Sequence, residues 1–122
     1  MKWHRRTLMQ KIVTINLEKS YPTVEEARQI LKVELERCRS QKVLAVKIIH
    51  GYGSSGVGGA LRNGIRKSLA LRRKEAEVKV VVFGEKWDLF DPMTQQALQE
   101  CPELGKDRDL RTPNPGISIV VL

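Results

Sequence analysis

The chain has 122 residues, of which 41% are apolar and 5% aromatic, and its formal net charge is +8. This length suits one domain around one core, and the apolar share excludes a disordered chain. Because no apolar run approaches the roughly 20 residues that span a bilayer, and none follows the charged N-terminus as in a signal peptide, we expect a cytoplasmic protein without membrane partners.

The chain begins with a basic arm, residues 1–11, which carries four basic and no acidic side chains, among them Lys2, Arg5 and Arg6. We expect this arm to precede one domain over residues 12–122. Positive charge gathers again in residues 60–83, where seven basic and two acidic groups give +5, whereas residues 84–122 carry −3. Clustered basic charge with a pI near 9.8 is typical of a polyanion-binding protein. The same charge is also compatible with a soluble domain that has a basic surface and no polyanion partner.

A strand is predicted over Ile12–Leu17, because apolar residues alternate there. Thr23 and Glu26 form a capping-box pattern, which predicts the start of a helix. The helix ends near Arg39, and its apolar face is defined by steps of three or four residues: Val24, Ala27, Leu31, Leu35 and Cys38. The two cysteines lie in no Cys-x-x-Cys or Cys/His cluster, so we predict neither a disulfide framework nor zinc, and a buried reduced thiol at Cys38.

The second strand, Val43–Ile49, is almost continuously apolar and rich in β-branched residues, which predicts a strand covered on both faces. A glycine-rich loop and a helix over about 60–75 follow, and Val78–Phe83 and Ile117–Leu122 are predicted as the last two strands. The order β-α-β-α-β-(insert)-β predicts a two-layer α/β domain, an α+β sandwich with two main helices on a mixed four-stranded sheet.

The insert occupies residues 84–116, between the third and fourth strands. Asp91-Pro92 predicts a short helix over 92–100, with Asp91 as its cap and Pro92 at its first position. We expect Trp87 and Phe90 to pin this insert to the domain as a covering loop.

The segment with the clearest chemistry is residues 50–59, where His50 precedes five glycines in nine positions, between a buried strand and a helix. Such places bind ligands in open α/β sheets, and bare amides at a helix start form a cradle for anions. Three arginines of the following helix (62, 66 and 73) fall within about 40° of one another at 100° per residue, which makes a basic stripe. We therefore predict phosphate binding by Gly51, Gly53, Ser54, Ser55, Gly56, Gly58, Arg62 and Arg66.

The residues alone leave two roles open for His50. With an ordinary pKa near about 6.5 it suits a general base, and its ring equally suits an anchor that holds the loop by hydrogen bonds. The glycines also match the dinucleotide pattern G-x-G-x-x-G, but the acidic residue expected about 20 residues further on is not clearly present. Binding of a small phosphorylated ligand or nucleotide is therefore a further alternative.

At this loop the chain resembles the Smr (small MutS-related) domain family. The likeness rests on the H-G-x-G sequence of His50–Gly53, on the helix that starts A-L-R at Ala60, and on T-V-E-E-A from Thr23. Residues 12–83 and 114–122 carry it, the latter including Asn114-Pro115-Gly116 before the last strand. The resemblance implies a fold similar to the C-terminal domain of a translation initiation factor. It also implies DNA or RNA binding and, in several members, endonuclease or nicking activity.

The chain departs from the family at the end of the first strand, where a motif of type L-D-x-H contributes to cleavage. Asn16 stands in place of the aspartate and Glu18 in place of the histidine. One alternative is that Glu18 replaces these residues beside His50, either by holding a divalent metal or by acting as a base. The other is that the protein still binds phosphate but no longer cleaves nucleic acid. We favour nucleic-acid binding without catalysis, with endonuclease activity of His50 and Glu18 as the alternative. The sequence predicts no metal site outside that alternative and leaves the oligomeric state open.

Overall fold

The computed structural model describes residues 11–20, 22–52 and 58–122. In chain order its helices and strands are β1 (Ile12–Asn16), α2 (Val24–Ser40), β2 (Ala45–Ile49), α3 (Gly58–Lys74), β3 (Val80–Phe83), α4 (Pro92–Glu100) and β4 (Ile117–Val121). Two short 3-10 helices, η1 (Gly84–Lys86) and η2 (Pro102–Lys106), flank α4. Of the basic arm, only Lys11 falls within these ranges, and its ammonium lies 2.7 Å from the carboxylate of Glu103.

The four strands form one mixed sheet in the order β1-β2-β4-β3. β1 runs parallel to β2, and β4 runs antiparallel to both of its neighbours, β2 and β3. The last strand of the chain therefore lies between β2 and β3, so the 84–116 insert carries the chain from an edge strand back into the interior of the sheet. The mixed four-stranded sheet of the predicted α/β fold is confirmed.

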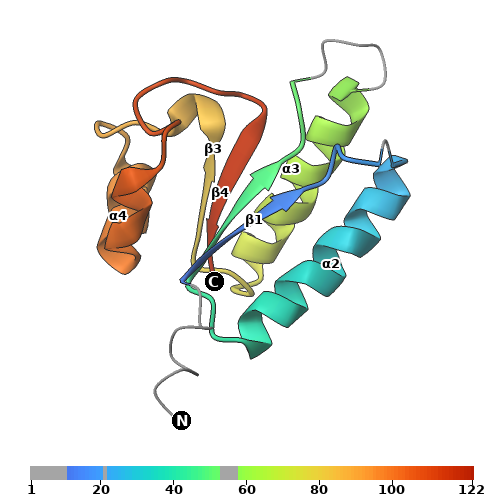
Figure 1. The fold of residues 1–122 in the computed structure, drawn as a ribbon, viewed down its shortest axis with the longest axis horizontal. Helices are drawn as coiled ribbons and strands as arrows, with labels where there is room; N and C mark the ends of the chain where they lie inside the picture. The colour runs from blue at the N-terminus through green and yellow to red at the C-terminus, as the bar shows by residue number, and fades with distance from the viewer. Residues whose placement is uncertain (1–10, 21, 53–57) are drawn as a thin grey trace, which may run out of the picture.

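Helices α2 and α3 pack side by side on one face of the sheet (Figure 1). At the start of α2 the Thr23 hydroxyl accepts a hydrogen bond from the Glu26 amide at 3.1 Å, and the Glu26 carboxylate accepts one from the Thr23 amide at 2.8 Å. This satisfies amides that the first helical turn leaves free, as the capping-box pattern predicted. The predicted apolar faces are also confirmed, since Leu31 on α2 and Leu69 on α3 are fully buried in the same core.

The two cysteines are both buried and unpaired, as expected for Cys38. Burial raises the pKa of each thiol, so neither is a ready nucleophile.

The insert covers the opposite face of the sheet and forms a second core with it, so that β2 is enclosed on both sides as its composition predicted (Figure 1). Helix α4 has the predicted bounds, and the Asp91 carboxylate accepts hydrogen bonds from the Met93 and Thr94 amides at 3.0 and 3.1 Å. The insert thus adds a third, partial layer to the sheet and to the layer formed by α2 and α3. Its position explains the burial of both faces of β2.

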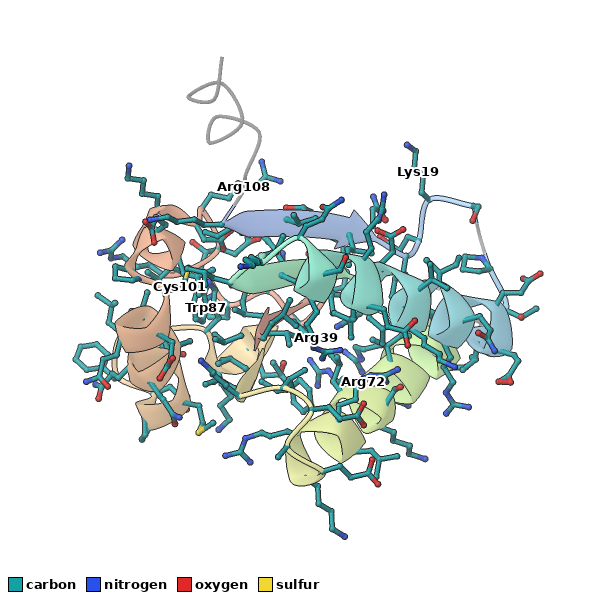
Figure 2. All side chains as sticks on the ribbon, turned by 90° about the horizontal axis from the view of Figure 1, so that it is seen from below. Lys19, Arg39, Arg72, Trp87, Cys101 and Arg108 are labelled. Carbon is teal, nitrogen blue, oxygen red and sulfur yellow. The ribbon has the colours of Figure 1, made fainter. Side chains whose placement is uncertain are left out.

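One expectation about the insert is wrong in part. Trp87 is fully buried and lies beside Cys101 on the α4 side of the sheet (Figure 2), so it does pin the insert. Phe90 is 91% exposed and pins nothing. The reason is local: the Asp88 carboxylate accepts a hydrogen bond from the Phe90 amide at 2.8 Å, which holds a tight turn with the ring pointing to solvent.

A partly buried ion cluster also fastens the insert to the sheet. The ammonium of Lys47, in the middle of β2, lies 2.8 Å from Asp107 and 2.6 Å from Asp109. The Trp87 indole N–H donates to Asp107 at 3.1 Å. Burial alone would lower the pKa of Lys47, but hydrogen bonds from its ammonium to the two carboxylates outweigh it and raise that pKa. The cation therefore stays charged and holds β2 and the insert together.

Candidate phosphate-binding site

The candidate site lies at one edge of the sheet, the upper edge in Figure 1. The strands β1, β2 and β3 end there, and β4 and α3 begin there. Main-chain hydrogen bonds connect the chain segments that meet there. The amides of His50 and Gly51 both donate to the Gly116 carbonyl at 3.0 Å, and the Leu17 amide donates to the Ile49 carbonyl at 2.8 Å. The loop after β2 is thereby fixed to both neighbouring strands.

His50 lies beneath this edge with no exposed surface. Its Nδ1 is 3.1 Å from the Gly51 carbonyl, which can only accept, so Nδ1 carries the proton. Its Nε2 is then an acceptor, 2.9 Å from the Ser118 hydroxyl on β4. Burial lowers the pKa of His50 to about 4, and the positive charges of Arg66 and Arg62 add to that effect. At neutral pH the ring is uncharged and both of its nitrogens are occupied.

Gly51 and Glu18 lie against each other at the end of β1. Gly51 has φ of 82°, a backbone conformation that favours glycine, and a Cβ placed on it would lie 2.2 Å from Glu18 Oε2. The Glu18 amide donates to the Asn16 side-chain oxygen at 2.9 Å, which closes a local turn. The structure therefore brings Glu18 to the H-G-x-G turn, on its exposed side, whereas the His50 ring faces the interior.

The structure describes only some of the residues that are predicted to bind phosphate. Gly53, Ser54, Ser55 and Gly56 lie outside the described residues. Gly58 is the first residue of α3, and a Cβ placed on the next residue, Gly59, would meet nothing within 4 Å. The first turn of α3 contains no acidic residue, so its positive dipole end has no carboxylate of its own there.

Arg62 follows one turn into α3 and is partly exposed. Its Nε is buried and has no hydrogen-bond partner among the described residues, and it forms no ion pair with any of them. Its positive charge contributes to lowering the pKa of His50 and the pKa of Glu85. A guanidinium in this state is available to an anion at the start of the helix.

Arg66, one turn further along α3, is instead held by the protein itself. Its Nη1 donates to Glu85 at 2.8 Å, its Nη2 pairs with the other Glu85 oxygen, and Nη2 also donates to the Pro115 carbonyl at 3.2 Å. The guanidinium carbon lies 4.6 Å from the centre of the Phe83 ring. The hydrogen bond from Arg66 lowers the pKa of Glu85, so this pair is ionised at neutral pH. Glu85 therefore competes with a phosphate for the Arg66 guanidinium, whose Nε, like that of Arg62, has no hydrogen-bond partner among the described residues.

Sequence reasoning missed two participants in this edge: Ser118, which holds His50, and Gly116, which accepts both loop amides. It considered Glu85 as a possible metal ligand in an acidic insert near the basic helix, but did not pair it with Arg66. A signal was present for Ser118, because it is the one polar residue in the strand ISIVV. Gly84 also lies at this edge, where a Cβ placed on it would be 1.7 Å from the Asn114 carbonyl oxygen.

Two features, a metal-binding cluster and a membrane-spanning helix, are absent from the part of the chain that the structure describes. Residues 11–20, 22–52 and 58–122 contain no group of three or more His, Cys, Asp or Glu side chains placed to hold a metal ion. Within the same ranges, no helix has the length and apolar character needed to cross a bilayer.

Similarity to known proteins is found at the level of the family and of the fold. The Smr domain family model matches residues 16–86, more than half of the chain. Among solved structures, the Smr domain of Thermus thermophilus MutS2 aligns over 92% of this chain and 96% of that chain, with a TM-score of 0.52 and 23% identity. At this identity the likeness shows a shared fold. A comparison with curated proteins found no match.

Proposed function

This chain belongs to the Smr domain family, and from that premise we propose that it binds DNA or RNA through phosphate groups held at the start of α3. The observation that carries the proposal is the state of Arg62. Its guanidinium stands one turn from the first residue of α3, at a glycine-rich helix start without acidic residues, and is unpaired among the described residues. A phosphate would supply the anion that this arrangement lacks.

The site suits a polymer of phosphates because several weak contributions act together. A helix N-terminus favours an anion by only about 0.3–1 kcal/mol at an exposed position. A charge-assisted hydrogen bond from a guanidinium adds roughly 1.5–3 kcal/mol. These terms carry no information about base sequence, so binding should be salt-dependent and have little sequence preference. The basic arm, with Lys2, Arg5 and Arg6, would add further phosphate contacts.

We further propose that His50 anchors the loop and is not a general base. This rests on its burial and on the hydrogen bond that Ser118 donates to Nε2, since a base must reach the proton that it abstracts. In this assignment the protein binds nucleic acid and does not cleave it.

Fluorescence anisotropy with labelled single-stranded and duplex oligonucleotides of DNA and RNA tests the binding site. We expect Arg62→Ala to weaken binding about tenfold and to reduce the slope of log affinity against log salt by about one unit. Lys67→Ala is the matched control: Lys67 is exposed on the same helix, so it removes the same charge on another face and should change affinity by less than about twofold. Equal losses in the two variants, or no binding in dilute buffer, would reject the proposed site.

One observation favours the endonuclease alternative, namely that the Glu18 carboxylate lies against Gly51 at the loop. Incubation with supercoiled plasmid and with structured RNA, in Mg²⁺, Mn²⁺ or EDTA, separates the two. Binding alone predicts intact substrate under every condition. Cleavage that Glu18→Gln and His50→Ala both abolish would establish the nuclease, with a divalent metal if EDTA stops it. Saturable binding of a mononucleotide without polymer binding would favour a small phosphorylated ligand.

A further inference from the structure

Tyr52 occupies the variable position of the H-G-x-G turn and is 54% exposed. Its ring lies on the backbone of Gly116: a Cβ placed on Gly116 would be 3.2 Å from Tyr52 Cε1 and 3.3 Å from Cδ1. Such contacts are tighter than most side chains make, so glycine at 116 lets the ring approach the chain closely. The ring thus packs against Gly116 while the residue remains exposed.

The support under this ring is rigid. The Gly116 carbonyl accepts the amides of His50 and Gly51 at 3.0 Å, and the Gly116 amide donates to the Asn114 side-chain oxygen at 3.0 Å. Two segments far apart in the sequence, the end of β2 and the approach to β4, therefore fix one aromatic surface. A ring held in this way loses little conformational freedom when a flat partner stacks on it.

Other aromatic residues within the described ranges are less suited to meet a ligand at this edge. Phe83 lies under the Arg66 guanidinium, and Trp87 is fully buried in the core of the insert. Phe90 is exposed but belongs to the insert, where its turn carries the two carboxylates of Asp88 and Asp91, which repel a polyanion.

We propose that Tyr52 stacks on an unpaired nucleobase of the strand whose phosphate is held at the start of α3, so that the preferred ligand is nucleic acid with unpaired nucleotides. This inference rests on the proposed function. A base within a duplex is already stacked between its neighbours and offers no free face, whereas an unpaired base does. Stacking tolerates any base, which agrees with a site built without groups for reading sequence.

The test compares single-stranded and duplex oligonucleotides of equal length on the full chain, by anisotropy. Tyr52→Ala should weaken single-strand binding about 5- to 100-fold and change duplex binding by less than about twofold. Tyr52→Phe keeps the ring and should stay within about twofold of the wild type on both. An oligonucleotide with one 2-aminopurine, whose fluorescence falls on stacking, should be quenched by the wild type and by Tyr52→Phe but not by Tyr52→Ala.

The outcomes separate this inference from the proposed function. If Arg62→Ala weakens both ligands while Tyr52→Ala leaves the single-strand to duplex ratio unchanged, the stacking role is overturned and phosphate binding stands. An equal loss on both ligands with Tyr52→Ala also overturns it, since a base-stacking role predicts selectivity. If no polynucleotide binds, the proposed function fails and the stacking role with it. Urea unfolding of each variant confirms that the fold is retained.

Discussion

Acidification should destabilise the protein through His50 in particular. Burial lowers the pKa of this residue to about 4 from an ordinary 6.5, so the fold favours the neutral ring. The stabilisation is fully present above pH 6.5 and is lost as the pH falls toward the folded-state pKa. The complete shift corresponds to about 3 kcal/mol of unfolding free energy, of which about 2 kcal/mol is lost between roughly pH 7.5 and pH 5.

The assay is urea unfolding at these two pH values, for the wild type and for His50→Asn, whose amide can replace the Nδ1–H donor. The variant should lose about 2 kcal/mol less than the wild type on acidification. Protonation of Asp109 and Glu85, whose pKa values are also lowered, destabilises both proteins equally and cancels in the difference. His4→Gln, which removes the only other histidine, should behave as the wild type. An unchanged pH dependence in His50→Asn would refute the assignment of a buried neutral ring.

Three further changes test the packing and the charges around the site. Trp87→Ala should cost about 3–5 kcal/mol in urea unfolding, whereas Phe90→Ala should cost less than about 0.5 kcal/mol; equal costs would contradict their different burial. Glu85→Gln should release Arg66 and strengthen polynucleotide binding about two- to fivefold at low salt, as measured by anisotropy. Unchanged or weaker binding would show that Arg66 does not reach the ligand. Lys47→Met should cost about 3–5 kcal/mol at neutral pH, because two carboxylates lose their cation, and a smaller loss would mean that water compensates them.

Much of this protein follows from short stretches of its sequence. The capping box at Thr23 and Glu26 starts α2, and Asp91-Pro92 starts α4 at the predicted residue. These signals work because each is completed within one helical turn and needs no distant partner. The apolar periodicities likewise identified the buried faces, and the glycine-rich segment after β2 marked the candidate site.

Only the tertiary structure decided which of the charged and polar groups are paired within the protein. Arg66 belongs to the predicted basic stripe, but it meets Glu85, 19 residues away, and His50 meets Ser118, 68 residues away. The reason is that β4, the last strand, pairs between β2 and β3, and this long-range pairing brings together partners that no local pattern connects. Sequence alone determined the elements and their apolar faces, whereas the sheet order determined which of the described side chains are paired with one another.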